Sequence, residues 1–362
     1  MLKLKTSILQ EMTQKAIKGA SFNKILPLTS MLAIELKDNV LTLTTTDFSN
    51  YLEVKQDKVE GEDFYVVVNA DIFAKLIGKL TTETVTMTLE NNVLTVKSNG
   101  EYKLELPVDE NGSLVKFPQY KKNLSTPSHS IKLATLKSIV NTNKASVAQD
   151  LSTPALTGYY VDNKGVLTSD SFVACHNKIT TIQDTFMLPF EVVELFNVLT
   201  AEDVNITTDS TNVIISTPNV TIYGKLLLEV ENFPVKEINE YLETSFVSYC
   251  KLSKDELLNI LDRLLLFVGD FDKNEVYLTF TNEGMLIESK QATGKELIKY
   301  TESHDFAPFT CCIDIEILKQ QIQAQQAEVV DVYYGNDTAI KVAQGAITQI
   351  VSLSDDERTA GV

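Results

Sequence analysis

The sequence predicts an α+β protein made of three similar domains, each with two helices packed on antiparallel sheets. The stretch Leu26 to Val54 (LPLTSMLAIELKDNVLTLTTTDFSNYLEV) has the order strand, tight turn, strand, Asp-bearing break, strand. The same order recurs at 155–179 and, more faintly, at 276–302. Helical patterns flank each copy. A unit that recurs three times predicts a repeat architecture.

The first strand block shows how each copy is recognised. Met31, Ala33 and Leu36 are expected to form the inward face of an alternating strand, and the Lys-Asp-Asn sequence at 37–39 supplies a turn. Leucines then alternate with threonines until Asp47 interrupts the pattern. Strict alternation is typical of half-buried strands, and Asn and Asp favour reversals.

Two helices are expected in each third of the chain. In the first of them, Leu9, Met12, Ala16 and Ala20 form an apolar stripe opposite charged residues. A hairpin follows each second helix, with reversals expected at 91–92, 209–210 and 336–337. The six helix windows are 6–20, 69–80, 130–148, 189–199, 253–268 and 314–325.

Spacing supports the repeat. Glu83, Glu202 and Glu328 open the three hairpins and lie 119 and 126 residues apart. The strands that follow the first turns open at 40, 166 and 285, which are 126 and 119 residues apart. Both series indicate a period of about 120 residues, within the usual size range of a domain. We therefore predict domains at 1–124, 125–245 and 246–362.

Composition favours a globular protein of the cytoplasm. The hydrophobic fraction is 44% and the charged fraction is 22%. No apolar run is as long as the about 18 residues that a membrane-spanning helix needs. The N-terminus lacks the apolar core of a signal peptide. The net charge of -17 argues against a wholly basic surface, although not against a local one.

Catalysis, cofactors and metal sites are not expected. The four cysteines form no CxxC pair and are expected to be free, buried or half-buried thiols. The histidines at 129, 176 and 304 are far apart in the sequence, and no HExxH, GxSxG or Gly-rich phosphate loop occurs. Cys175 and His176 are neighbours, but consecutive strand residues face opposite ways and cannot easily share a proton.

Several short segments, in a fixed order, carry a resemblance to a known family. They are Leu26-Pro27, Thr46-Asp47, Phe117-Pro118, Gln149-Asp150 leading to Gly158, Ser169-Asp170 and Phe233-Pro234. In this order, and with the threefold period, the chain resembles the bacterial DNA polymerase III beta subunit, the sliding clamp, over nearly its whole length. The chain is identified as a divergent member.

The resemblance implies a DNA clamp fold whose three domains form a ring as a head-to-tail homodimer. Such a ring encircles double-stranded DNA without sequence preference and serves DNA replication as a processivity factor. It tethers the replicative DNA polymerase and is served by a clamp loader, without catalysing a reaction. The alternative is a repeat-built protein-interaction scaffold that does not encircle DNA.

The helices are expected to face the DNA. The six helix windows together carry a net charge of +1 and the remaining chain -18, so acidic residues lie mainly outside the helices. A weakly positive bore suits loose, sequence-independent phosphate contact. Lys24 lies close to a basic family position that either Asn23 or Lys24 fills, and Gln149 matches a polar one. The DNA-facing candidates are Lys15, Lys18, Lys24, Lys75, Lys79, Lys137, Lys144 and Gln149.

The resemblance also implies a hydrophobic cleft between the second and third domains that takes a short partner peptide. Many clamps have Gly-His-Arg where this chain has 171–173, so we expect a more apolar pocket. We further expect an acidic tail (Asp355, Asp356 and Glu357) at its rim and an altered partner peptide. The candidate residues are Leu156, Ser169, Ser171, Phe172, Val173, Pro234, Ile350, Val351 and Leu353. Interdomain packing is the alternative role for Phe172 and the Ile350 strand.

The seam of the ring would join the first domain of one subunit to the third domain of the other. Tyr102 and Leu104 are expected to contact Phe267 and Val268. In addition, Lys75 or Lys97 is expected to meet Glu296 or Glu302. Charged pairs at a rim contribute specificity more than affinity.

Overall fold

A computed structural model describes residues 1–22, 25–124, 126, 128–150, 152–178, 182–228, 230–268, 274–291, 293–302 and 305–356. The fold is α+β, as predicted. Two compact units form, one from 1–136 and 191–226 and the other from 137–190 and 227–362. None of the helices in the described ranges is long and apolar enough to span a membrane.

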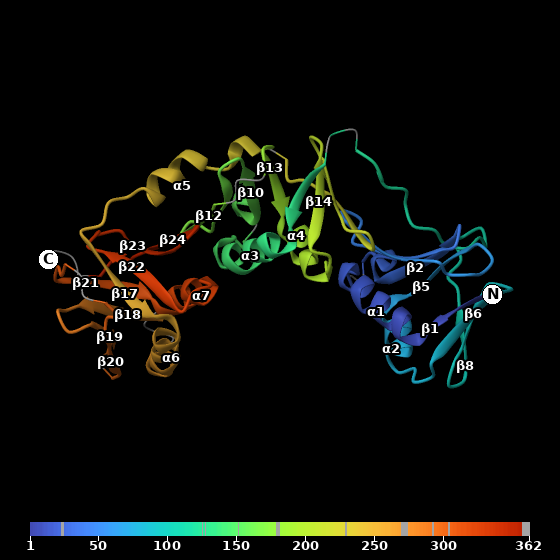
Figure 1. Cartoon of the computed structure of the whole chain (residues 1–362), viewed down its shortest axis with the longest axis horizontal. Helices are drawn as coiled ribbons and strands as arrows, with labels where there is room; N and C mark the ends of the chain where they lie inside the picture. Colours follow the sequence, from blue (N-terminus) through green and yellow to red (C-terminus); the bar gives the residue numbers. More distant parts are fainter. Residues whose placement is uncertain are drawn as a thin grey trace. The chain divides into compact units, whose positions relative to one another are not determined.

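The first unit contains two antiparallel sheets (Figure 1). The larger has the strand order β5 (Phe64–Asn69), β2 (Met31–Lys37), β3 (Val40–Thr46), β4 (Tyr51–Asp57), β16 (Val220–Lys225), β15 (Asn212–Ser216), β14 (Asp203–Thr208) and β9 (His129–Lys132). The smaller has the order β1 (Leu2–Lys5), β6 (Thr84–Glu90), β7 (Val93–Lys97) and β8 (Glu101–Glu105). Strands from the first and second thirds of the chain meet where β4 pairs with β16.

The second unit repeats this arrangement. Its larger sheet has the order β13 (Phe186–Pro189), β10 (Gly158–Asp162), β11 (Gly165–Ser169), β12 (Val173–Asn177), β24 (Ile347–Ser352), β23 (Ala339–Gln344), β22 (Val329–Tyr334) and β17 (Ser248–Ser253). Its smaller sheet has the order β20 (Lys295–Ile298), β19 (Met285–Ser289), β18 (Glu275–Phe280) and β21 (Phe309–Asp314). Strands from the second and third thirds meet where β12 pairs with β24.

Each of the six predicted helix windows contains a helix. They are α1 (Thr6–Ala16), α2 (Ala70–Gly78), α3 (Leu133–Asn143), α4 (Phe190–Glu194), α6 (Lys254–Leu264) and α7 (Ile315–Ala324). Short 3-10 turns extend four of them, namely η1 (Ile17–Gly19), η3 (Lys144–Ser146), η5 (Leu195–Val198) and η7 (Leu265–Phe267). A further helix, α5 (Val235–Leu242), was not predicted.

The hairpin-opening glutamates occupy the same structural position in all three repeats. The backbone carbonyl of each glutamate accepts a hydrogen bond from the backbone N–H of the residue that opens the first helix of the same repeat. The three bonds run from Thr6 to Glu83 (3.0 Å), from Leu133 to Glu202 (2.9 Å) and from Lys254 to Glu328 (2.8 Å). The repeat in the sequence is therefore a repeat in the structure. The exact domain boundaries stay a prediction.

The turn residues behave as expected, whereas the alternation does not. Asp38 and Asn39 have positive φ values of 50° and 61° between β2 and β3, a conformation that Asn and Asp tolerate. In β2, however, Leu32 and Ile34 are as buried as Ala33. The prediction of a strand with one exposed face is wrong here. Helix α1 packs against β3 and β4 of this sheet, and the segment 116–122 borders β2 and β3.

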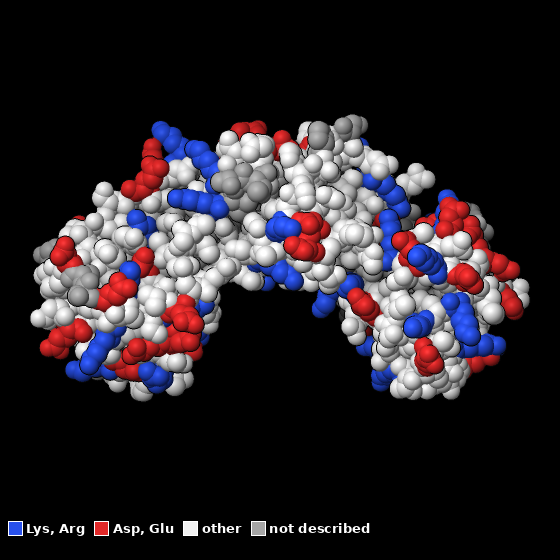
Figure 2. Space-filling model, in the orientation of Figure 1, with Lys and Arg blue, Asp and Glu red and all other residues white. Residues whose placement is uncertain are grey.

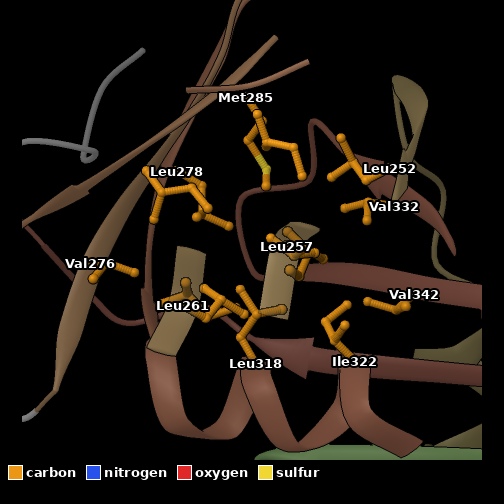
Figure 3. Close-up of a cluster of buried hydrophobic side chains, with 14 of the residues drawn as sticks. Leu252, Leu257, Leu261, Val276, Leu278, Met285, Leu318, Ile322, Val332 and Val342 are labelled. Carbon is orange, nitrogen blue, oxygen red and sulfur yellow. The ribbon is translucent and has the colours of Figure 1, made fainter. Parts of the chain in front are cut away.

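Helices and both sheets share one core in the second unit (Figure 3). Leu257 and Leu261 of α6 point toward Leu318 and Ile322 of α7, and side chains from β17, β18, β19, β22 and β23 complete the cluster. Burial of each such side chain stabilises the folded state by about 1.5–3 kcal/mol. Because one stripe of each helix is fixed in this core, the polar stripe of each helix remains available for binding.

Candidate DNA and partner interfaces

A cleft of about 380 Å³ lies in the second unit, where β12 pairs with β24 beside α5. We call it the second-unit cleft. Its walls come from the β11–β12 turn, from α5 and from the end of the last hairpin. The lining residues are Leu156, Ser169, Ser171, Val173, Ala174, Pro234, Glu237, Ile238, Tyr241, Thr338 and Ser352.

A hydrogen-bonded turn shapes one wall of this cleft. The Asp170 carboxylate accepts bonds from the backbone N–H groups of Phe172 (2.9 Å) and Val173 (2.7 Å). The Ser169 hydroxyl donates to the carbonyl of Val173 (2.8 Å). Ser171 has a φ of 81°, a value that glycine adopts more readily. The Asp170 carboxylate therefore serves the turn rather than a ligand.

Five of the nine predicted pocket residues line the cleft, namely Leu156, Ser169, Ser171, Val173 and Pro234. The other four do not. Phe172 is 62% exposed, Ile350 and Val351 are buried in the sheet, and Leu353 packs against the neighbouring core. The Phe172 side chain is thus largely in solvent and outside the lining of the cleft, and its role in making the pocket more apolar stays a prediction.

Helix α5 contributes cleft residues that the sequence analysis missed. Glu237, Ile238 and Tyr241 all line the cleft, and the Tyr241 hydroxyl lies 2.9 Å from the Ser352 hydroxyl. The apolar positions 235, 238 and 242 have helical spacing, and this signal could have revealed the helix.

Within the predicted acidic tail, Asp356 is not among the residues that line the cleft. Asp356 is 2.9 Å from the Lys290 ammonium and accepts a bond from the Tyr277 hydroxyl (3.0 Å). Lys290 also pairs with Glu275 at 2.6 Å. The predicted position of Asp356 is thus wrong, and Glu357 lies outside the described residues. Glu275, Asp356 and Cys312 lie close enough to hold a metal ion, but both carboxylates are already paired with the Lys290 ammonium.

The cysteines are free and buried, as predicted. Burial raises the pKa of each thiol, to about 12 for Cys250 and Cys312. Burial likewise raises the pKa of Cys175. Because the neighbouring His176 ring contacts the Lys164 carbonyl (3.2 Å), these two residues do not form a nucleophile and base pair.

The predicted DNA-facing lysines of the first unit differ in their exposure and in their ion pairs. The Lys15 side chain is 18% exposed, and its ammonium lies 2.8 Å from Glu11. Lys75 is paired with Asp71 at 2.7 Å. Lys18 and Lys79 are exposed and form no ion pair with any residue that the structure describes. Lys24 lies outside the described residues.

In the second unit, Lys144 and Gln149 line one groove of about 670 Å³, whereas Lys137 is exposed outside it. The groove is rich in amide side chains. Its other lining residues are Asn141, Ala145, Phe190, Gln320, Gln323, Ala324, Gln325 and Gln326. The Lys144 ammonium lies 5.3 Å from the centre of the Phe190 ring. Amide groups can contact DNA without adding net charge.

Charge on the surface is mixed. On the face shown in Figure 2, basic and acidic side chains are interspersed within each unit. Neither sign forms a continuous field on this face. This pattern agrees with weak rather than strong electrostatic attraction for nucleic acid.

The predicted seam residues lie on or near two sheet edges. Tyr102 and Leu104 belong to β8, the edge strand of the small sheet in the first unit. Phe267 is 50% exposed, and its ring packs against Gly294 beside β20, the edge strand of the small sheet in the second unit. Val268 is partly buried against the core of that unit.

The charged residues expected at the seam already have partners within the chain. Glu296 forms a bidentate pair with Arg263 at 2.6 and 2.8 Å. Glu302 pairs with Lys251 at 2.8 Å, and Lys97 pairs with Glu101 at 3.2 Å. Any contact across a seam would have to share these charges.

A buried carboxylate joins the segment after the first small sheet to the large sheet of the first unit. Glu53 is fully buried and pairs with Lys55 (2.8 Å) and Lys122 (2.6 Å). The hydroxyls of Tyr120 and Tyr223 also donate to it. Burial raises the pKa of Glu53, but the hydrogen bonds from Lys122, Lys55 and Tyr120 outweigh burial and lower it to about 2.

Comparison with known proteins accounts for this architecture. Residues 2–114 match the family model of the DNA polymerase III beta subunit, N-terminal domain. The sliding clamp of Bacillus subtilis is 19% identical and superposes with a TM-score of 0.86, over 98% of this chain and 99% of that one. The beta subunit of Streptococcus pyogenes is 17% identical, with a TM-score of 0.88 over 98% and 100%. No curated protein sequence matches the chain.

The chain has the sliding-clamp fold. The family match in the first third and the full-length likeness, both at low identity, are consistent with a divergent member of the beta-subunit family. The two matched structures are a DNA polymerase sliding clamp and a DNA polymerase beta subunit.

Proposed function

We propose that this protein is a DNA sliding clamp, which encircles duplex DNA as a head-to-tail homodimer and tethers a replicative polymerase and other partners. It works in the cytoplasm, at DNA, and is placed there by a clamp loader. The observation that carries the proposal is a strand-pairing rule that two junctions obey and that leaves two complementary edges unused.

The rule follows from the order of the strands in the sheets. Each third of the chain contributes a block of four strands, and one end of this block in the sheet order is β4, β12 or β20. Each third also contributes a hairpin segment, whose last strand is β8, β16 or β24. The block of the first third pairs with the hairpin segment of the second through β4 and β16. The block of the second pairs with that of the third through β12 and β24.

Applied once more, the rule pairs β20 with β8. Both strands are edges in the described sheets, and unpaired edges carry backbone groups that favour pairing with another chain. A second copy supplies the missing partner for each edge, and two identical junctions close a ring. The seam residues Tyr102, Leu104, Phe267 and Val268 lie on or beside these edges.

Few and weak phosphate contacts suit a protein that must slide. The exposed lysines Lys18, Lys79 and Lys137 supply charge, while the groove around Lys144 and Gln149 supplies mainly amides. Topological closure, rather than affinity, then keeps the ring on DNA. The second-unit cleft is the proposed docking site for a short segment of the polymerase or another partner.

Two measurements test the proposal. A ring requires a stable dimer with twice the 40.3 kDa of one chain in light scattering. Primer extension on a circular template, with the cognate polymerase and loader, should give longer products when the protein is present. A monomer that leaves product length unchanged would instead support a protein-interaction scaffold.

A further inference from the structure

The first unit contains a second cleft of the same build. It also measures about 380 Å³, and it lies where β4 pairs with β16. We call it the first-unit cleft. Its lining residues are Phe48, Ser49, Tyr51, Pro118, Gln119, Tyr120, Lys121, Asn212, Val213, Tyr223, Gly224 and Lys225.

The turn in its wall uses the same hydrogen bonds as the turn of the second-unit cleft. The Asp47 carboxylate accepts from the backbone N–H groups of Ser49 (2.8 Å) and Asn50 (2.6 Å). The Thr46 hydroxyl donates to the Asn50 carbonyl (2.7 Å). Phe48, with a φ of 76°, takes the place of Ser171 in the other turn. The two clefts therefore occupy equivalent positions in the repeat.

The remaining walls also correspond. Each cleft is bounded by a segment that follows a Phe-Pro pair, represented by Pro118 in one and Pro234 in the other. Each is also bounded by the end of a hairpin, at Tyr223–Lys225 in one and at Ser352 in the other. A position that forms a cleft in one junction thus forms a cleft in the other.

The first-unit cleft has aromatic walls. The Tyr120 ring stacks on Tyr51 with centroids 3.9 Å apart and meets Tyr223 edge-on at 5.0 Å. The strand positions equivalent to Tyr51 and Tyr223 in the other junction are Ala174 and Ile350. Fixed aromatic faces contribute large contact areas with little loss of side-chain entropy, so they favour an apolar or aromatic group in the ligand.

The charges of the two clefts are opposite. Lys121 and Lys225 line the first-unit cleft without any carboxylate, whereas Glu237 lines the second-unit cleft without any lysine. The Lys121 ammonium forms an ion pair with Asp209 at 2.6 Å. Lys225 is exposed and forms no ion pair within the described part of the chain. The nearby Glu53 is neutralised by Lys55 and Lys122. An acidic ligand is thus matched to the first cleft.

We propose that the first-unit cleft is a second peptide-binding site, which takes a short segment that combines carboxylate side chains with a large apolar or aromatic one. The class of ligand rests on the proposed function, because it is carried over from the equivalent cleft. One ring would then hold partners of two kinds, with acidic segments in the first-unit cleft and less acidic ones in the second.

A photo-crosslinking experiment tests this site on the full chain. The probe is a short synthetic peptide that contains glutamates, a leucine and a central benzoylphenylalanine, and the control probe has lysines in place of the glutamates. Crosslinked residues are located by mass spectrometry. We expect the acidic probe at 48–51, 118–121 or 223–225, and far less crosslinking there with the basic probe.

Two matched variants sharpen the result. Lys225→Glu reverses an exposed rim charge and should weaken binding of the acidic probe roughly fivefold. Glu237→Lys, a charge reversal in the second-unit cleft, should leave crosslinking in the first-unit cleft unchanged. Phe48→Ser installs the residue type that the equivalent turn carries, keeps the turn and should also weaken binding.

Crosslinking only in the second-unit cleft, or a first-cleft signal that Lys225→Glu does not reduce, would overturn the inference. Neither outcome touches the proposed clamp function, which is tested separately by dimer mass and product length. Conversely, a monomer that crosslinks in the first-unit cleft would overturn the clamp while leaving the peptide site in place.

Discussion

Glu53 shows how a single residue can hold distant parts of a unit together. Its partners Tyr120 and Tyr223 lie 67 and 170 positions away along the chain. A glutamate in a strand is ordinarily exposed, so the sequence offers no sign that this one is buried. Nothing local marks Tyr120 as its partner either. Such long-range polar clusters emerge only when the strands are brought into register.

The buried Glu53 carboxylate predicts a pH-dependent loss of stability in Glu53→Gln. The folded pKa of about 2 lies below the ordinary 4.5, so the charge stabilises the fold above about pH 4.5, and this contribution is lost as pH falls toward 2. We expect Glu53→Gln to lower the unfolding free energy by about 3 kcal/mol at pH 7. Urea denaturation between pH 7 and pH 3 measures this difference, which should shrink as the solution is acidified.

The control for this change is Glu62→Gln, since the Glu62 side chain is 93% exposed. It should change stability by less than about 0.5 kcal/mol at every pH. A Glu53→Gln deficit that stays constant down to pH 3 would show that packing, rather than charge, is responsible.

Two lysines on neighbouring turns of the first unit should differ in their contribution to DNA binding. Lys18 is exposed without an ion pair in the described ranges, whereas Lys15 is mostly covered and held by Glu11. We expect Lys18→Ala to reduce the slope of log affinity against log salt by about one, as for the loss of one phosphate contact. Lys15→Ala should change it less. Fluorescence anisotropy with short duplex DNA at several salt concentrations measures both slopes, and equal slopes in the two variants would contradict the assignment.

At the scale of elements, helix caps are predictable from sequence and can be tested singly. The Asp314 carboxylate accepts bonds from the backbone N–H groups of Glu316 (2.8 Å) and Ile317 (3.0 Å) at the start of α7. Asp314→Ala should lower the unfolding free energy by about 1 kcal/mol, because those donors lose their partner. Asp314→Asn keeps an acceptor oxygen and should cost much less. Urea denaturation measures the unfolding free energy of both variants. Equal losses of unfolding free energy in the two variants would argue against a capping role for Asp314.

The long amphipathic helices and the threefold strand block were predictable because each carries its own periodic pattern. Helix α5 was not predicted, since it is eight residues long and lies at 235–242, just before the domain boundary that we expected after residue 245. The short strands β1, β9 and β17 were also missed. Their four to six residues give little pattern, and each is fixed by pairing with a strand about 75 to 85 positions away.

The site was predicted less completely than the fold. Sequence order located the turn at Ser169 and Ser171 correctly, because its hydrogen bonds are local. It failed for Phe172 and for the tail at Asp356, whose orientations depend on packing against distant strands and on Lys290. Residues that act through local geometry can thus be carried over from a repeat, whereas residues placed by tertiary contacts cannot.

At the scale of the whole molecule, the proposed function depends on two sheet edges, β8 and β20, that have no strand partner in the described sheets. The outer strands β8 and β20 have exposed side chains, including Tyr102 at 36% and Leu297 at 40%. A monomer would leave apolar groups and unpaired backbone at both edges in solvent. In the proposed ring, dimerisation would cover both edges at once, so we expect closure to be cooperative.

Charge placed on one of these edges should therefore open the ring. In Tyr102→Glu, closure would bury a carboxylate at the seam without a partner, and we expect the dimer dissociation constant to rise at least about tenfold. Tyr249→Glu is the matched control, because Tyr249 is a similarly exposed tyrosine (44%) on β17, which is an edge strand of the large sheet and belongs to neither small sheet. Sedimentation equilibrium gives the dissociation constants, and primer extension on a circular template shows whether loss of the dimer shortens the products. If Tyr102→Glu and Tyr249→Glu dimerise equally well, β8 is not part of the seam and the strand-pairing rule does not extend beyond the single chain.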